Sequence, residues 1–169
     1  APPRSRKRPY FLCVGRLEFY KGFQHVIRAM QFLPDHDLII VGSGTYLPSL
    51  IDMAAHSNVQ KQVIFMNNIP ISNLAQLYSG AAAHVALSTH ESYGLTVGES
   101  LLSGTPCLVR KNGALGDWAE HEGCIATNET DPKTLSNLIL KCSSLTPSYD
   151  DPMTWDNVVK TLLDLYSDD

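Results

Sequence analysis

Glu91 and Glu99, eight positions apart in the stretch HESYGLTVGES, are the residues best suited to chemistry in this sequence. Glu91 stands in front of a glycine turn at Gly94, and Glu99 falls in the first turns of the helix expected after it. Free N–H groups at a helix N-terminus attract phosphate, and a nearby carboxylate accepts hydrogen bonds from vicinal sugar hydroxyls. The stretch therefore suits a sugar nucleotide, while a helix cap or a solvated surface is the commoner explanation of each glutamate taken alone.

Two cations stand five positions apart in an earlier glycine-flanked stretch, GRLEFYKG. Arg16 follows Gly15, and Lys21 precedes Gly22 at the expected start of a helix. A pair of cations, together with free backbone N–H groups, can bind a pyrophosphate. Two ordinary surface cations explain the pattern about as well, so the spacing alone leaves both interpretations open.

A second glycine loop, made of Gly42, Ser43 and Gly44, follows an apolar run. The absence of side chains permits another group to approach its backbone closely, and a plain tight turn accounts for it equally well. This loop is a weaker candidate than the paired cations or the paired glutamates.

Two further patterns look functional, but their surroundings argue against it. Asp35, His36 and Asp37 spell the D-x-D pattern of some metal- and nucleotide-binding sites, yet they precede an expected strand, and Pro34 with two short acids favours a turn. The six histidines include no HExxH, and a satisfied or solvated side chain is the expected role even for His90, which abuts Glu91. We therefore expect no metal site.

The formal net charge of -4 is unevenly distributed along the chain. Residues 1–28 hold seven Lys or Arg and one acidic residue, so they carry +6 while the remainder carries -10. This favours a small anionic ligand near the first helix over a nucleic acid, which needs a broad basic surface. A solvated tail is the simpler explanation of the first four cations, which are Arg4, Arg6, Lys7 and Arg8.

Length and composition indicate one globular domain. The chain has 169 residues, 44% of them hydrophobic and 18% charged, which excludes disorder and collagen. Its longest apolar stretches fall short of the roughly 18 residues that a membrane helix needs. The four cysteines show no CxxC spacing, which indicates a reduced intracellular chain without structural zinc. No export signal is visible, because the apolar run at residues 10–14 is shorter than the about 7 residues required.

Short β-branched runs alternate with stretches of helical period, which is the signature of βαβ units. We predict a Rossmann-like, doubly wound parallel α/β sheet of about six strands, because right-handed crossovers place helices on both faces. Ligands of such sheets bind at the carboxyl ends of the strands, where the candidate loops stand. The expected strands lie near residues 10–15, 37–41, 62–66, 83–87, 106–109 and 123–126.

Apolar residues at helical spacing predict the covering helices. Ser72 is expected to cap one helix, and Asp131, followed by Pro132, another. Residues 143–154 are expected to connect to a last helix around Trp155. The helix faces expected in the core are Phe23, Val26, Ile27 and Met30, then Leu47, Leu50, Ile51 and Ala54, then Leu74, Leu77 and Tyr78, and finally Leu135, Leu138 and Ile139.

In their order and spacing, the motifs together resemble the donor-binding, C-terminal domain of retaining GT-B glycosyltransferases of the glycosyl transferases group 1 family, family four. ESYGLTVGES resembles the family's E-x7-E motif, GRLEFYKG its G-R-L…K-G, VGSG its G-x-G and SGTPCLV its A-x-G-x-P-V-V. Gly113, Leu115 and Asp117 resemble its G-G-x-P-E loop, and the Trp155 helix resembles its closing helix. The likeness spans nearly the whole chain.

The resemblance implies a hexosyltransferase, such as a mannosyltransferase of polysaccharide biosynthesis, that moves a sugar from a nucleoside-diphosphate sugar to a glycan, a lipid or another acceptor. Arg16 and Lys21 would hold the donor pyrophosphate and stabilise the leaving diphosphate, without a metal ion or other cofactor. Glu91 would face the transferred sugar, and Glu99 would bind the ribose hydroxyls. The other donor-binding residues implied are Gly15, Gly42, Ser43, Gly44, Asn68, Ile69, Ser92, Tyr93, Gly94, Leu95 and Thr96, with Asn68 and Ile69 at the base.

Three places depart from the family pattern. Asn67 stands where a glycine is usual after the third strand, and asparagine also tolerates a left-handed backbone. Ser92 and Tyr93 replace a Gly-Phe pair, which leaves the donor sugar open. Gly116 and Asp117 stand where Pro and Glu are common.

The resemblance also implies that the acceptor-binding half of the enzyme is absent from this chain. Residues 1–9 would be a linker from that missing N-terminal domain, 10–145 the donor-binding domain, and 146–169 a connector with a helix that crosses back. The expected partners are a sugar nucleotide and the missing domain, not a nucleic acid, and the expected location is the cytosol or, through the missing half, the cytosolic face of a membrane. A nucleotide-sugar epimerase of the same fold and a noncatalytic nucleotide-binding or interaction module remain as alternatives.

Overall fold

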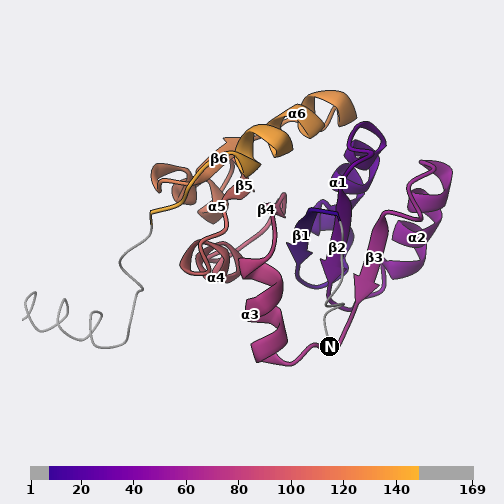
Figure 1. Cartoon of the computed structure of the whole chain (residues 1–169), viewed down its shortest axis with the longest axis horizontal. Helices are drawn as coiled ribbons and strands as arrows, with labels where there is room; N and C mark the ends of the chain where they lie inside the picture. The colour runs from indigo at the N-terminus through magenta and orange to yellow at the C-terminus, as the bar shows by residue number, and fades with distance from the viewer. Residues whose placement is uncertain (1–7, 149–169) are drawn as a thin grey trace, which may run out of the picture.

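The computed structural model describes residues 8–148. They contain one six-stranded parallel sheet (Figure 1). The strands are β1 (Tyr10–Val14), β2 (Asp37–Val41), β3 (Val63–Met66), β4 (Ala83–Ala86), β5 (Cys107–Arg110) and β6 (Cys124–Thr127). They lie in the order β3-β2-β1-β4-β5-β6, and every neighbouring pair is parallel. The predicted Rossmann-like sheet is confirmed, and each strand end lies within one residue of its expected place.

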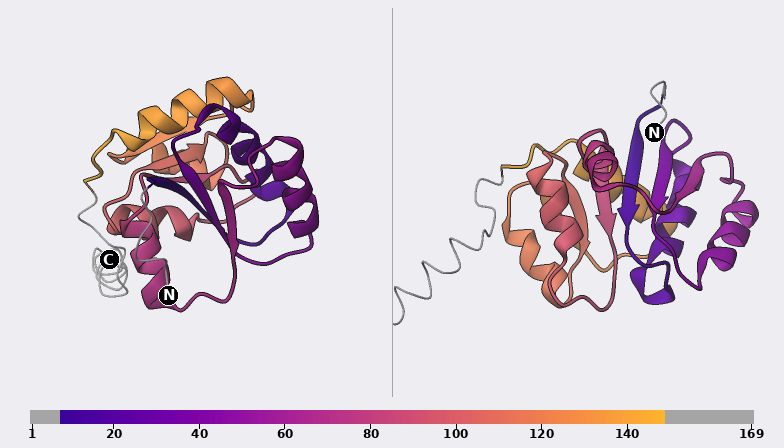
Figure 2. Two further views of the ribbon diagram at one scale, coloured as in Figure 1. Left: turned by 45° about the vertical axis from the view of Figure 1, so that its right-hand side comes forward. Right: turned by 90° about the horizontal axis from the view of Figure 1, so that it is seen from below.

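Helices cover both faces of the sheet (Figure 2). One layer consists of α1 (Phe23–Ala29), α2 (Leu47–His56) and α6 (Pro132–Ser143). The other consists of α3 (Ile71–Ser79), α4 (Leu95–Leu102) and α5 (Ala114–Asp117). Single 3-10 turns are η1 (Phe19–Lys21), η2 (Met30–Phe32) and η3 (Trp118–Glu120).

Burial on both faces explains the apolar sequence of the inner strands. Along β2, Leu38 and Ile40 pack against the layer of α1, α2 and α6, whereas Ile39 and Val41 pack in the cluster that contains α3. A strand covered on both sides has a continuous apolar run rather than an alternating one. The loops at its carboxyl end are therefore anchored on a fully packed strand.

The expected helix faces are confirmed with one exception. Leu135 and Ile139 of α6 are buried, as is the whole expected face that begins at Phe23. Ile51 is 49% exposed, because α2 buries only a narrow stripe that contains Leu50 and Ala54. The expected last helix around Trp155 lies outside the described residues.

The two predicted helix starts have different outcomes. Asp131 caps α6, and its carboxylate accepts hydrogen bonds from the backbone N–H and the hydroxyl of Thr134 at 2.9 and 2.8 Å. Ser72 does not cap α3, because that helix begins at Ile71. Pro70, with φ -56° and ψ 145°, already occupies the non-helical position that precedes a helix, so the chain turns helical before Ser72.

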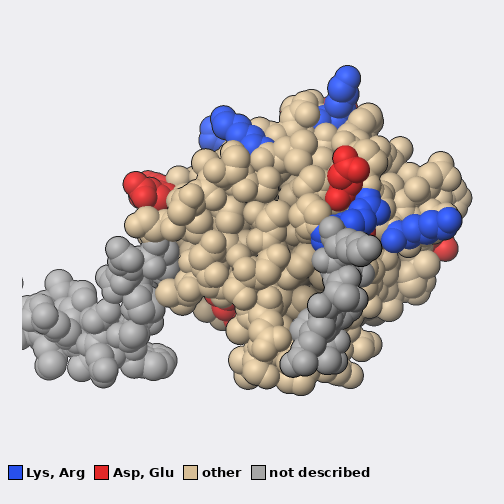
Figure 3. Space-filling view, in the orientation of Figure 1, with Lys and Arg blue, Asp and Glu red and all other residues tan. Residues whose placement is uncertain are grey.

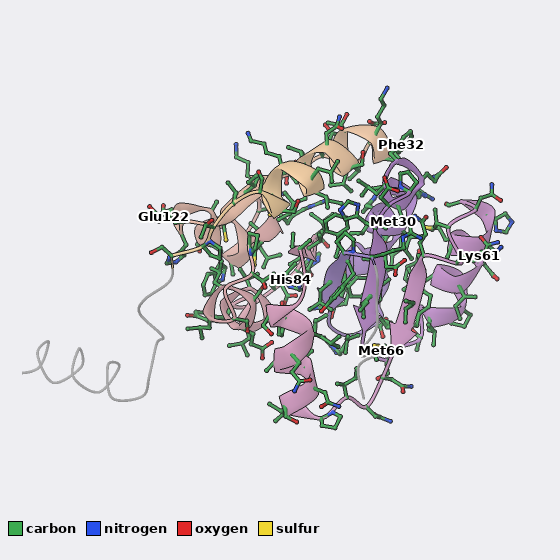
Figure 4. All side chains as sticks on the ribbon, in the orientation of Figure 1. Met30, Phe32, Lys61, Met66, His84 and Glu122 are labelled. Atoms are coloured by element: carbon green, nitrogen blue, oxygen red, sulfur yellow. The ribbon has the colours of Figure 1, made fainter. Side chains whose placement is uncertain are left out.

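The topology places a switch point between β1 and β4. The chain connections from these two central strands leave toward opposite edges of the sheet, and ligands of doubly wound folds bind at this switch point, beyond the carboxyl ends. Met66, labelled in Figure 4, marks the carboxyl end of β3 at the same edge. The loops after β1 and β4 therefore border the place where a ligand is expected.

The Asp35-His36-Asp37 triplet lies at the opposite, amino edge of the sheet. Asp37 opens β2 and pairs with Arg8 at 3.8 Å, and the ring of His36 stacks on Phe11 with centroids 4.7 Å apart. The triplet is thus far from the carboxyl edge, as its position before a strand predicts.

All four cysteines are described, and all are free. Within residues 8–148, no helix has both the length and the apolarity to cross a bilayer.

His84 on β4, labelled in Figure 4, predicts how stability depends on pH. Its ring is buried, Nδ1 lies 3.1 Å from the carbonyl oxygen of Leu12, and burial lowers its pKa to about 4. An unfolded chain protonates histidine near pH 6.5, so below that pH and down to about 4 only the unfolded state gains the proton. The free energy of unfolding should therefore fall by about 2 kcal/mol between pH 7 and pH 5.

Urea denaturation of the wild type and of His84→Gln at both pH values measures this contribution. Glutamine does not titrate, so the variant should lose about 2 kcal/mol less than the wild type over the same interval. Equal losses in the two proteins would assign the acid sensitivity to other groups.

Candidate functional site

Backbone hydrogen bonds join the loops after β1, β2 and β4 into one surface. The N–H of Leu17 donates to the carbonyl of Ser43 at 2.8 Å, which holds the first loop against the second. The N–H of Thr89 donates to the carbonyl of Tyr20 at 2.9 Å, which holds η1 against the loop after β4. The predicted site residues, although distant in sequence, therefore share one framework.

The glycines after β2 are required by the protein's own backbone. A Cβ at Gly42 would lie 1.8 Å from the carbonyl oxygen of Gly15, and one at Gly44 would lie 2.3 Å from that of Leu17. Real Cβ contacts are never so short, so only glycine fits at both positions. The group that approaches the backbone of these glycines is thus the loop after β1 of the same chain. The residues that shape this framework are Gly15, Gly42, Ser43 and Gly44.

An ion pair joins the segments that follow β1 and β4. Lys21 of η1 donates from Nζ to Oε1 of Glu91 in the loop after β4. The two side chains are 14% and 24% exposed, so the pair is shielded from much of the solvent and remains reachable by a ligand. Charges in such partly buried positions interact more strongly than on an open surface. The two residues predicted to act on the donor diphosphate and sugar thus meet at the switch point.

Tyr20 contacts both cations of the first loop, Arg16 and Lys21. Its hydroxyl accepts a hydrogen bond from Nη2 of Arg16 at 2.6 Å, and Nζ of Lys21 lies 5.5 Å from its ring centroid. His90 lies edge-on to the same ring at 6.2 Å, beside the ion pair rather than within it. Arg16 is exposed, so its other N–H groups are open to a ligand. Sequence analysis missed Tyr20, and an aromatic residue between two cations was the available signal.

Glu99 is exposed on α4, but one of its oxygens is held. Oε2 accepts a hydrogen bond from the hydroxyl of Tyr78 at 2.8 Å, and Tyr78 on α3 is only 2% exposed. Oε1 receives no hydrogen bond from the described residues, and the Glu99 residue as a whole is exposed. Tyr78 was expected only in the apolar face of its helix, and its hydroxyl is the part that sequence analysis missed.

Trp118 fixes the loop in front of α4. Its Nε1 donates to the carbonyl of Tyr93 at 2.7 Å, and the two rings pack edge to face at 5.7 Å. Gly94, with φ 87°, turns the chain into α4, whose first N–H groups have no intrahelical partner. The predicted residues at this helix start are Ser92, Tyr93, Gly94, Leu95 and Thr96.

A pocket of about 340 Å³ opens beyond the carboxyl end of β3. Asn68 and Ile69, both expected at a nucleotide base, line it. The left-handed residue is Asn68, with φ 49°, and not Asn67, because the carbonyl of Met66 still accepts the N–H of Gly42 at 2.8 Å and holds the strand end in place. The other lining residues are Phe65, Met66, Asn67, Pro70, Asn73 and Leu77.

In the part of the chain that the structure describes, no three His, Cys, Asp or Glu side chains cluster as metal ligands. On the face drawn in Figure 3, charged residues of both signs lie scattered among uncharged ones. The charged residues predicted for the site are Arg16, Lys21, Glu91 and Glu99, and the structure pairs Lys21 with Glu91.

Comparison with known proteins supplies the family. The model of the glycosyl transferases group 1 family matches residues 1–153. An uncharacterized glycosyltransferase of Methanocaldococcus jannaschii is 35% identical over 114 residues, which are 66% of this chain and 29% of that protein. The alpha-monoglucosyldiacylglycerol synthase of Streptococcus pneumoniae is 32% identical over 155 residues, which are 79% of this chain and 35% of that protein. The chain thus spans about a third of the length of these curated relatives.

Solved structures share the fold. Anabaena HepE, solved in complex with UDP and glucose, has a TM-score of 0.74 and 23% identity, and the match covers 81% of this chain and 39% of that one. A sucrose-phosphate synthase of Thermosynechococcus elongatus has a TM-score of 0.77 and 23% identity, with 96% and 45% covered. With the sheet order and the family match over most of its length, the chain belongs to the glycosyl transferases group 1 family.

Proposed function

We propose that the chain is the donor-binding part of a retaining glycosyltransferase that takes a hexose from a nucleoside-diphosphate sugar. The observation that carries this proposal is the pairing of Lys21 with Glu91 at the switch point, with Arg16 beside them on Tyr20. A partly buried cation next to an exposed one, at the edge where such sheets bind ligands, suits a diphosphate.

Lys21 and Arg16 compensate the charge that grows during the reaction. As the glycosidic bond breaks, the sugar carbon becomes oxocarbenium-like and negative charge develops on the departing phosphate oxygen. Donors already aimed at that oxygen stabilise the transition state more than the ground state. Glu91 faces the sugar, where its carboxylate stabilises the positive carbon. With two cations in these places, we expect no metal ion or other cofactor to be required.

Glu99 and the pocket after β3 hold the nucleoside in this proposal. The unbonded Oε1 of Glu99 accepts hydrogen bonds from the ribose hydroxyls, while Asn68 and Ile69 contact the base. The backbone N–H groups of Gly94 and Leu95, at the start of α4, meet phosphate or sugar oxygens. Base, ribose, diphosphate and sugar would then lie along the carboxyl edge from β3 to β4.

Replacing Glu91 with Gln should tighten the binding of a nucleoside diphosphate roughly fivefold while sugar transfer falls. The neutral amide releases Lys21 from its ion pair and removes the repulsion between the carboxylate and the phosphates. Isothermal titration of both proteins measures the change. Weaker binding by Glu91→Gln would mean that the ion pair assists the diphosphate site instead of competing with it.

Titration of UDP, GDP and ADP, each free and attached to glucose or mannose, tests the proposed function. UDP has priority because the HepE structure holds UDP and glucose. One base should bind, and Glu99→Ala should weaken that binding about tenfold, the effect of losing a hydrogen bond to a charged group. Binding of none of the three would overturn the proposal and favour a noncatalytic interaction module.

The acceptor site belongs, in this proposal, to a partner domain outside the chain. The curated relatives are about three times as long as the part that this chain matches. We assign residues 1–9 to a linker, 10–145 to the donor-binding domain and 146–169 to a connector with a helix that crosses to the partner domain. The isolated chain should therefore bind the donor and turn it over slowly.

A further inference from the structure

We propose that Tyr78 is a positioning residue that presents the carboxylate of Glu99 to the ribose of the donor. The inference rests on the proposed function, because it takes the ribose-binding role of Glu99 as given. In this role Tyr78 does not touch the ligand, and its hydroxyl serves to hold the carboxylate of Glu99.

The hydrogen bond between these side chains connects the two helices that border the nucleoside. The hydroxyl of Tyr78, on α3, donates to Oε2 of Glu99, on α4, at 2.8 Å. Tyr78 is 2% exposed, so its hydroxyl cannot reach a ligand, whereas Glu99 is exposed. Oε2 of Glu99 is thus held by Tyr78, whereas Oε1 is left to form hydrogen bonds with solvent or a ligand.

Tyr78 is itself fixed on several sides. Its carbonyl accepts the hydroxyl of Thr105 at 2.5 Å, and its ring packs edge to face against His84 at 5.5 Å. Burial, and then the nearby Glu99 carboxylate, raise the pKa of Tyr78 well above its ordinary value. The phenol therefore stays protonated and is a permanent donor to Glu99.

Holding Glu99 in one rotamer removes an entropic cost of binding. A free glutamate side chain must be ordered before it can bind two ribose hydroxyls, and Tyr78 orders it in advance. Leu77, the preceding residue on α3, lines the pocket after β3. The same helix therefore sets the wall of the base pocket and the direction of the ribose carboxylate.

Titration of Tyr78→Phe with UDP, GDP and ADP, each beside its 2′,3′-dideoxy analogue, tests the inference. The analogues lack both hydroxyls, so they report every contact except those made by the ribose hydroxyls. Tyr78→Phe should weaken the natural nucleotide about fivefold and leave the dideoxy nucleotide unchanged. Adding Tyr78→Phe to Glu99→Ala should cause no further loss, because the two changes remove one shared interaction.

Tyr10→Phe is the matched control. The hydroxyl of Tyr10 donates to the carbonyl of Leu77 at 2.8 Å, so its removal also takes a tyrosine hydroxyl from the packing of α3 but does not touch Glu99. This variant should bind both nucleotides as the wild type does. If Tyr78→Phe does not fold, Glu99→Asp, whose carboxylate is one methylene farther from Tyr78, should show the same ribose-dependent loss.

The outcomes separate this inference from the proposed function. An equal loss for natural and dideoxy nucleotides would show that Tyr78 only supports the fold, and no loss for either while Glu99→Ala weakens binding would also overturn the inference. In both cases the proposed function stands. If the wild type binds no nucleotide, or if Glu99→Ala leaves binding unchanged, the ribose role of Glu99 fails, and this inference fails with it.

Discussion

Replacing Lys21 with Ala is expected to weaken nucleoside diphosphate binding on the order of 100-fold. The Nζ of Lys21 is the partly buried cation at the switch point, and its loss leaves the carboxylate of Glu91 to repel the phosphates. The double variant Lys21→Ala/Glu91→Gln should recover part of the loss, since it removes the repulsion as well. Isothermal titration at fixed ionic strength measures the affinities.

Lys61→Ala is the control for a nonspecific effect of net charge. Lys61 is exposed and precedes β3, at the amino edge of the sheet, as its label in Figure 4 shows. Its removal changes the formal charge by the same amount and should leave affinity within about twofold, because exposed charges beyond about 10 Å are screened. A similar loss in Lys61→Ala would reduce the role of Lys21 to general electrostatic attraction.

Replacing Gly22 with Ala should lower the free energy of unfolding by about 3 kcal/mol. Gly22 ends η1 with φ +77°, and an added Cβ would lie 2.6 Å from the carbonyl oxygen of Leu87. The substitution therefore adds a collision with backbone to the cost of a left-handed alanine. For a domain of this size the melting temperature should fall on the order of 10 °C.

Gly104→Ala isolates the collision from the backbone strain. Gly104 has the same φ of +77°, but an added Cβ would meet nothing within 4 Å. This variant should cost only about 1 kcal/mol. Equal costs in urea denaturation would mean that the contact with Leu87 relaxes freely and that the loops after β1 and β4 are not rigidly joined.

The fold is predictable from the sequence because each structural cause leaves a local trace. A strand buried on both faces, such as β2, is a continuous apolar run, and each crossover helix has an apolar stripe. The helix start at Asp131 is visible because the side chain itself makes the cap. The start of α3 is not visible in the sequence, because the backbone geometry at Pro70 determines where this helix begins, and the hydroxyl of Ser72 does not.

The candidate residues are predictable as a set, but their pairings are not. Lys21 and Glu91 are 70 positions apart and meet only because β1 and β4 are neighbours in the sheet. Tyr78 belongs to an apolar helix face because its ring is buried. The spacing of the apolar residues does not reveal that its hydroxyl contacts Glu99. Such contacts depend on strand order and helix packing, which the sequence does not state locally.

A crystal structure of the chain with the nucleoside diphosphate selected by titration tests the central claim most directly. We expect phosphate oxygens within hydrogen-bond distance of Lys21 Nζ, ribose hydroxyls on Oε1 of Glu99, and the base in the pocket lined by Asn68 and Ile69. The Lys21–Glu91 pair should be open in that complex. A nucleotide bound elsewhere, or bound at this edge with the ion pair closed and Glu99 untouched, would contradict the account.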